Sequence, residues 1–336
     1  MPVILNRCTP RRERFDNEPV TDRTAILTRA AGYGADEPLM IGVQRDGAPP
    51  VSLTSGRAAA GEPLTAESIV YTASLSKQIT AACAALLVQQ GRLDTEATLA
   101  RWMPELPAWA ATVRLRHLIS HTSGLPEGVE FHDLHRAKLD RTTAGVIRAL
   151  VRRDHLVSTP GTRYRYCNAG YVCLAVIIER AAGRPLPDFA REHVFTPLGM
   201  ARTRYWAGPE PHPPRAVPLD PQYPAPLSLG DGGVWSTTPD LIRWNHALER
   251  DELGVSGLLQ TPGRLDDGTQ IDYAWALDVR EHAGRRIYRH GGRWAGLSTQ
   301  LVRLAGRRSS FVIIALDNDE DRTATLATAM IADLTT

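Results

Sequence analysis

The feature that most constrains the fold is a helix-forming segment, residues 78–88, that is apolar on nearly every side. Its alanine and leucine content favours a helix, and Gly91 ends it. A helix without a polar face has to be covered all round. The sequence therefore predicts that this helix lies at the centre of a large core, which a chain of 336 residues is long enough to build.

A serine and a lysine stand three residues apart where this helix begins, as Ser74 and Lys77. This spacing puts both side chains on one helix face, although a capping serine and a surface lysine would give the same pattern. The chain has only two lysines, Lys77 and Lys138, against thirty-seven arginines. A desolvated lysine can lose its proton and act as a base, whereas arginine stays protonated. The pair therefore predicts a serine nucleophile that Lys77 activates.

Strand and helix signals occur in the order strands, helices, strands, helix. The expected strands are 39–43, 51–57, 273–280, 285–290, 298–304 and 309–317, and the expected helices are 78–88, 115–120, 143–153, 170–182, 238–248 and 322–334. The Pro-rich segment 208–226 predicts a long loop. The simplest assembly is an α+β fold with one antiparallel sheet flanked by helices. Residues 1–105 and 227–336 then form an α/β lobe, residues 106–226 form an inserted helical lobe, and the cleft between them holds the site.

Composition excludes several classes of function. The hydrophobic share of 43% and the charged share of 23% are those of a globular protein. The net charge is +2 and the charges are interspersed, so we expect no nucleic-acid partner. We find no secretory signal and no run of the ~20 apolar residues that a membrane span needs, so we expect a cytoplasmic protein without a membrane partner. The four cysteines have no metal-ligand spacing, and His117 and His121 lack the acidic partner of a zinc motif, so we expect no metal and no cofactor.

Two further segments carry groups that suit acyl chemistry. A phenol and a carboxamide, Tyr166 and Asn168, lie two residues apart before an apolar helix, where they can relay a proton and hold a carbonyl. His290, Gly291 and Gly292 end an expected strand, and the glycines allow a substrate to approach backbone N–H groups. Taken singly, these residues are better explained as a packed tyrosine, a capping asparagine and a hairpin turn.

In this order the three segments resemble the three motifs of the serine β-lactamase and penicillin-binding protein superfamily. Neighbouring stretches resemble its class C-type branch. These stretches are His121-Thr-Ser-Gly-Leu-Pro126, Pro160-Gly-Thr followed by Tyr164, Tyr166, Asn168 and Tyr171, Pro197-Leu-Gly-Met200, and Gly232-Gly-Val-Trp-Ser-Thr237. The resemblance runs from about residue 39 to about residue 330, so it covers nearly the whole chain.

The resemblance implies a role for each residue. Ser74 is the nucleophile that becomes acylated, and Lys77 is its base. Tyr166 passes the proton to the leaving group and helps to activate the deacylating water. Asn168 binds the acyl amide or carbonyl, and the backbone N–H groups of Ser74 and Arg293 form the oxyanion hole. The reaction is a double displacement through an acyl-enzyme.

The third motif departs from the β-lactamase pattern. His290 stands where β-lactamases carry a lysine that binds a substrate carboxylate, and a neutral imidazole lacks that charge. Gly291 replaces a hydroxyl-bearing residue that helps to bind the same group. Members with such a motif include esterases, amidases, D-aminopeptidases and acyltransferases. Arg293 is a candidate for an anion contact, and Trp294 is the tryptophan most expected to touch substrate.

The sequence thus predicts a cofactor-free serine hydrolase of the esterase or amidase type, acting on a small ester, amide or peptide. Three alternatives stay open. The same acyl-enzyme can transfer its acyl group to an amine or alcohol, the chain can be a β-lactamase or D,D-peptidase, or it can be a binding protein that kept the fold. The oligomeric state is not predicted.

Overall fold

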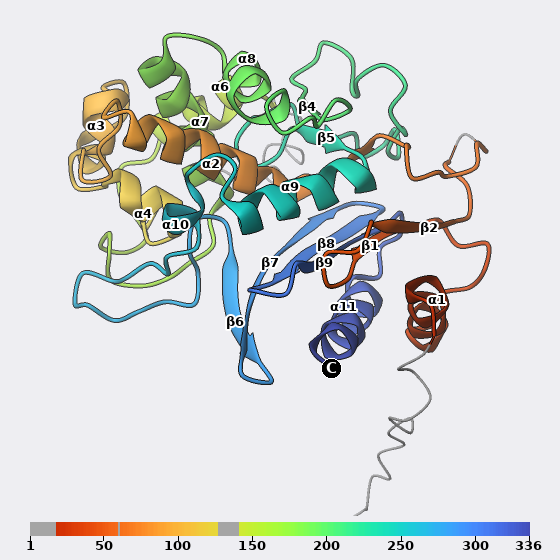
Figure 1. Cartoon of the computed structure of the whole chain (residues 1–336). Coiled ribbons are helices and arrows are strands. Elements are labelled where there is room, and N and C mark those ends of the chain that lie inside the picture. The colour runs from red at the N-terminus through yellow and green to blue at the C-terminus, as the bar shows by residue number, and fades with distance from the viewer. Residues whose placement is uncertain (1–17, 60, 127–140) are drawn as a thin grey trace, which may run out of the picture.

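The computed structural model describes residues 18–59, 61–126 and 141–336, so Lys138 lies outside the described residues. Its larger sheet has six antiparallel strands in the order β2-β1-β9-β8-β7-β6 (Figure 1). These strands are β1 (Leu39–Gln44), β2 (Val51–Ser55), β6 (Asp278–His282), β7 (Arg285–Trp294), β8 (Leu297–Leu304) and β9 (Ser309–Ala315). Because β1 pairs with both β2 and β9, the two ends of the chain meet in one sheet, as the sequence predicts.

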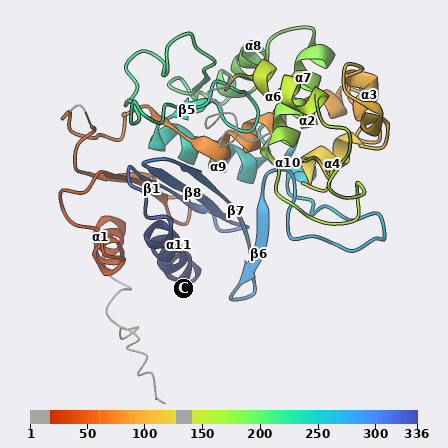
Figure 2. The ribbon, with the colours of Figure 1, turned by 180° about the vertical axis from the view of Figure 1, so that it is seen from behind.

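Helices cover both faces of this sheet (Figures 1 and 2). One face carries α11 (Glu320–Thr335), with α1 (Val20–Ala30) beside it, and the other carries α9 (Thr238–Arg250). Alternate strand residues therefore enter different cores: Met40 packs on the α9 side, whereas Ile41 packs on the α11 side. The period of two along β1 explains how a strand that is buried throughout serves both layers.

The remaining helices pack together beyond α9. They are α2 (Ser76–Gln89), α3 (Leu99–Trp102), α4 (Leu115–Ile119), α6 (Thr143–Val151), α7 (Asn168–Ala182), α8 (Leu186–Ala190) and α10 (Ser256–Leu259). Helix α2 packs against α7, α8 and α10 and is buried over most of its length. This arrangement confirms the prediction of a central apolar helix. We find no helix in the described part of the chain that is long and apolar enough to cross a membrane.

A second, small sheet has the order β3-β5-β4, formed by β3 (Val70–Tyr71), β5 (Val234–Ser236) and β4 (Arg204–Tyr205). Strand β4 belongs to the predicted insertion, yet it pairs with β5, which belongs to the predicted α/β lobe. The division of the chain at residues 105 and 226 stays a prediction. The small sheet leads directly into the turn that precedes α2.

Several expected elements differ from the observed ones. Strand β7 continues to Trp294, so the third motif lies within a strand rather than at its end. Residues 273–277 precede β6 and are not part of a strand. Helix α1 was not expected, because its apolar residues are few and charged residues interrupt them. Helix α7 starts at Asn168, two residues earlier than expected, which fixes this amide at a helix start.

Candidate active site

The nucleophile candidate lies on a sharp turn at the start of α2. Ser74 is in a single 3-10 turn, Ala73–Leu75, and Ala73 has a φ of 48°, which few residues other than glycine adopt. Lys77 is fully buried in the first turn of α2. Its Nζ donates to Ser74 Oγ at 3.1 Å and to the carbonyl oxygen of Asp231 at 2.7 Å. The amine is therefore held beneath the hydroxyl and within reach of its proton.

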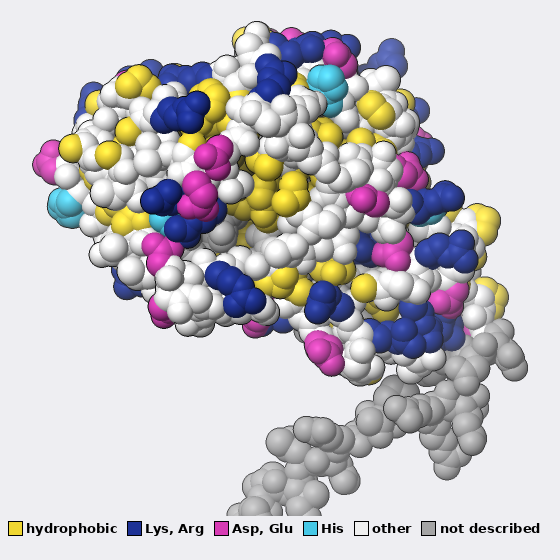
Figure 3. All heavy atoms as spheres, turned by 60° about the vertical axis from the view of Figure 1, so that its left-hand side comes forward, with side chains coloured by type: hydrophobic (Ala, Val, Ile, Leu, Met, Phe, Trp, Pro, Cys, Tyr) yellow, Lys and Arg dark blue, Asp and Glu magenta, His cyan; other side chains and the backbone are white. Residues whose placement is uncertain are grey.

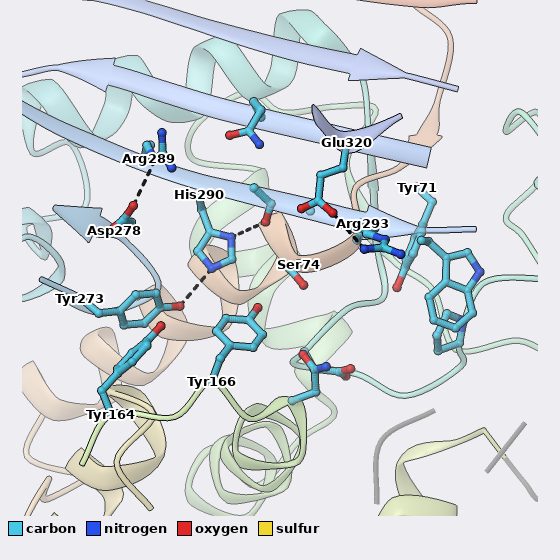
Figure 4. Close-up of a pocket in the computed structure, with 18 of the residues that line it drawn as sticks. Tyr71, Ser74, Tyr164, Tyr166, Tyr273, Asp278, Arg289, His290, Arg293 and Glu320 are labelled. Carbon is cyan, nitrogen blue, oxygen red and sulfur yellow. Dashed lines mark hydrogen bonds and ion pairs between the residues drawn. The ribbon is translucent and has the colours of Figure 1, made fainter. Parts of the chain in front are cut away.

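The second motif lies against this pair. The ring of Tyr166 lies 5.0 Å from Lys77 Nζ, and Figure 4 shows its hydroxyl pointing toward Ser74. The Tyr166 ring also packs against the His121 ring, with 4.2 Å between centroids. Asn168 lines the same cleft as Ser74. The structure thus brings together all four residues of the first two motifs.

The third motif lies on the part of β7 that runs beside the nucleophile, and there one edge of the strand is unpaired among the described residues. Strand β6 pairs with β7 only as far as Arg289, whereas β8 pairs with β7 as far as Trp294. From His290 onward, β7 therefore has one side without a strand partner in the described sheet. A Cβ on Gly292 would lie 2.8 Å from Thr72 O and 3.0 Å from Ser74 N. Glycine is required here because the strand backbone runs so close to the nucleophile's turn.

His290 is buried and hydrogen-bonded at both ring nitrogens. Its Nδ1 lies 2.6 Å from Gly291 O, and its Nε2 lies 3.0 Å from the hydroxyl of Tyr273 (Figure 4). Burial, together with the charge of Lys77, lowers the pKa of His290 to about 3. The imidazole is therefore neutral near pH 7. Sequence reasoning missed Tyr273 because it placed this residue in a strand rather than in the loop before β6.

A buried carboxylate also faces the site, and sequence reasoning missed it. Asp231 lines the cleft with 5% of its surface exposed, and it accepts a hydrogen bond from Ser228 Oγ at 2.9 Å. Burial raises the pKa of Asp231 to about 6, and the positive charge of Lys77 opposes this rise. The signal in the sequence was a lone acid among glycines, directly before the Gly232-Gly233 pair.

The cleft has a volume of about 1080 Å³. Residues of β7 line one side of it, and residues at the starts of α2 and α7 line the other. Seven of the remaining predicted site residues line it with Ser74: Tyr166, Asn168, His290, Gly291, Gly292, Arg293 and Trp294. Arg293 pairs with Glu320 at 3.0 Å, and Trp294 Nε1 donates to Tyr223 O at 2.8 Å. No group of three or more metal-ligating side chains occurs in the described ranges. The face of the molecule that Figure 3 shows has basic and acidic side chains interspersed, with apolar side chains between them.

Comparison with known proteins shows the family to which the chain is similar over most of its length. A family model described as Beta-lactamase matches residues 31–335. The chain is 33% identical over 291 residues to a penicillin-binding protein of Bacillus subtilis, a match that covers 78% of this chain and 63% of the relative. It is 31% identical over 258 residues to a D-aminopeptidase of Cereibacter sphaeroides, covering 72% of this chain and 49% of the relative. The chain thus spans about half to two thirds of the length of these relatives.

Solved structures share the fold at lower identity. A D-amino acid amidase from Ochrobactrum anthropi superposes with a TM-score of 0.76 at 22% identity, covering 92% of this chain and 99% of the amidase. A penicillin-binding protein from Bacillus halodurans gives the same TM-score at 21% identity, covering 92% of this chain and 98% of that protein. These likenesses show the α+β fold with its antiparallel sheet flanked by helices.

Proposed function

Because this chain belongs to the β-lactamase family, we propose that it is a serine hydrolase that cleaves small esters or amides through an acyl-enzyme on Ser74. One observation carries this proposal. Lys77 Nζ lies 3.1 Å from Ser74 Oγ, beside a cleft of about 1080 Å³. A buried amine at this distance is suited to take the hydroxyl proton as the serine attacks.

The proposed reaction has two displacements. In the first, Ser74 Oγ bonds to the substrate carbonyl carbon, its proton passes to neutral Lys77, and the bond to the leaving group breaks. Tyr166 delivers a proton to the departing oxygen or nitrogen, since its ring lies beside both Lys77 and the cleft. In the second, water attacks the acyl carbon and gives a proton to Tyr166, the bond from that carbon to Ser74 Oγ breaks, and Lys77 returns its proton to Ser74 Oγ.

The proposed oxyanion hole consists of the backbone N–H groups of Ser74 and Arg293. The closeness of Gly292 to Ser74 N supports it, because the strand edge and the nucleophile's turn then face the same point. Two backbone donors fixed in this way cost no reorganisation when negative charge develops on the carbonyl oxygen. Asn168, at the start of α7, is proposed to hold the acyl side of the substrate.

We further propose that the acyl group carries an amine, as in a D-amino acid amide or ester. Asp231 supports this substrate class, because a buried carboxylate in the cleft is stabilised when a substrate ammonium binds beside it. The names of the relatives, D-aminopeptidase and D-amino acid amidase, agree with it. The amine would then lie on the Lys77 side of the cleft, where the Asp231 backbone binds that residue.

The test is a burst experiment with p-nitrophenyl acetate and with the p-nitrophenyl ester of D-alanine. We expect a stoichiometric burst and then steady turnover, with both absent in Ser74→Ala, and a higher kcat/KM for the D-alanine ester. Adding an amine or alcohol acceptor separates hydrolysis from acyl transfer, since transfer gives a new amide or ester. The proposal fails if Ser74→Ala turns over these esters as fast as the parent protein.

A further inference from the structure

Two buried residues connect the third motif to the helical side of the cleft, and the proposed reaction gives neither a role. Tyr273 lies in the loop before β6, and His121 follows α4. The hydroxyl of Tyr273 lies 3.2 Å from His121 Nε2 and 3.0 Å from His290 Nε2. All three side chains are buried. They form a continuous path of hydrogen bonds from β7 to the residue that follows α4, which we call the His-Tyr-His relay.

The ends of the relay determine which nitrogen of each histidine carries the proton. The backbone N–H of Cys167 donates to His121 Nδ1 at 3.1 Å, so neutral His121 carries its proton on Nε2 and donates it to Tyr273. At the other end Gly291 O can only accept, so His290 Nδ1 carries a proton. This leaves His290 Nε2 as an acceptor, to which the Tyr273 hydroxyl donates its hydrogen in preference to the neighbouring hydroxyl of Tyr171.

This order opposes protonation of His290. A proton added at Nε2 would point at the Tyr273 oxygen, which already accepts from His121, and the Tyr273 hydrogen would have to turn from His290 to the hydroxyl of Tyr171. The titratable or charged groups around His290 are Lys77 on α2, His121 after α4, Tyr166 before α7, Tyr273 before β6, and Arg289 on its own strand, which pairs with Asp278. Burial, Arg289 and the protonated form of Lys77 act in the same direction as the relay.

The other cations along the cleft are paired with carboxylates. Among the described residues that line it, Arg280 pairs with Asp272 and Asp278, and Arg289 pairs with Asp278. Arg293 pairs with Glu320. A substrate carboxylate would therefore have to compete with an existing carboxylate for these cations, because the third motif supplies no charge.

We propose that Tyr273 is a positioning residue that, together with His121, holds His290 as the neutral Nδ1–H imidazole and thereby excludes substrates with a carboxylate on the leaving group. The specificity part of this inference rests on the proposed hydrolase function, and the tautomer part does not. The preferred substrates are neutral esters and amides, and peptides with a free carboxyl end are disfavoured.

The tautomer is measured directly by two-bond proton–nitrogen correlation spectra of protein with 15N-labelled histidine. We expect His290 to be the neutral Nδ1–H form and His121 the neutral Nε2–H form, without titration between about pH 5 and pH 8. His290→Gln identifies the His290 signals. In Tyr273→Phe, His290 should titrate in this range or change tautomer. A wild-type His290 that carries its proton on Nε2, or that titrates there, overturns the inference.

Specificity is measured with two esters that differ by one charge on the leaving group, 4-acetoxybenzoate and its methyl ester. In the wild type we expect the methyl ester to be preferred by a ratio that is constant between about pH 5.5 and pH 7.5. In Tyr273→Phe the relative kcat/KM of the carboxylate should rise as the pH falls, by about tenfold, the value of one charge-assisted hydrogen bond. An identical, pH-independent ratio in both proteins overturns the inference.

Tyr33→Phe is the matched control, because it removes a buried hydroxyl hydrogen bond of 2.8 Å, to Thr323, on the far side of the sheet. It should leave the ratio and the His290 spectrum unchanged. If Tyr273→Phe does not fold, His290→Lys tests the same point, since a permanent charge should favour the carboxylate at every pH. If neither ester shows turnover that depends on Ser74, the proposed function fails, and the spectra alone decide the role of the relay.

Discussion

The closest backbone approach in the site can be tested by adding one methyl group, in Gly292→Ala. The new Cβ would lie 2.4 Å from Thr299 Oγ1, 2.8 Å from Thr72 O and 3.0 Å from Ser74 N. To reach an ordinary contact of about 3.4 Å with Thr72 O, β7 has to move away from the nucleophile's turn by about 0.6 Å. That movement opens the proposed oxyanion hole between Ser74 and Arg293.

The expected loss in kcat is about a hundredfold. Removing one oxyanion donor costs a factor of about 100 to 1000, and a misplacement of about 1 Å costs a similar factor. Overpacking should also cost about 1–3 kcal/mol of unfolding free energy, which lowers the melting temperature by several degrees. The assay is burst and steady-state release of p-nitrophenol from p-nitrophenyl acetate, with the melting curve recorded in the same buffer.

Gly291→Ala is the matched comparison, since its Cβ would meet only the mobile end of Gln300, at 2.9 Å, with Thr299 O at 3.5 Å. It should lose no more than about threefold in kcat, because a flexible side chain can move aside. Equal losses in the two variants, or a Gly292→Ala protein within about threefold of wild type, would refute the reasoning from backbone contact.

Three other predictions concern the ionisable groups. Lys77→Arg should lower kcat for p-nitrophenyl acetate by a factor of about 100 to 10,000, because arginine stays protonated. A folded Lys77→Arg protein with the kcat of the wild type would contradict this. Tyr166→Phe should slow amide hydrolysis more than p-nitrophenyl ester hydrolysis, since nitrophenolate leaves without a proton; equal losses for both substrates would argue against proton delivery. The pKa of Asp231 is raised to about 6, so the folded protein binds the extra proton and loses stability as the pH rises from about 4 to about 6. Asp231→Asn should remove up to about 3 kcal/mol of this pH dependence of unfolding, and an unchanged dependence in denaturant melts would exclude Asp231 as its source.

Sequence patterns were enough to predict those parts of the site whose structure depends on residues close together in the sequence. The spacing of Ser74 and Lys77 and the apolar run of α2 depend on residues within a few turns, and both were found from the sequence. The antiparallel sheet followed from alternation and intervening glycines. The order of the three motifs then identified the family, which the comparison confirms.

Residues that act through tertiary contacts were not predicted. Tyr273 hydrogen-bonds to His121 and His290 only because the loop before β6 lies along the cleft. No pattern among neighbouring residues predicts the course of that loop. Asp231 reads as one acid in a glycine-rich turn until the burial of Lys77 beside it is known. The length of β7 was underestimated because its glycines were interpreted as a turn, whereas close packing on the nucleophile's turn keeps them in the strand.

The pairing of β1 with β9 has a consequence for synthesis of the chain. During synthesis, β1 and β2 emerge from the ribosome long before β7, β8 and β9. The β1–β2 hairpin therefore exposes the apolar edge of β1 that later pairs with β9. Distant pairing of this kind folds slowly and leaves time for aggregation. The turn that carries Ser74 likewise emerges before the strand edge that faces it, so we expect a nascent chain to be inactive until β7 is in place.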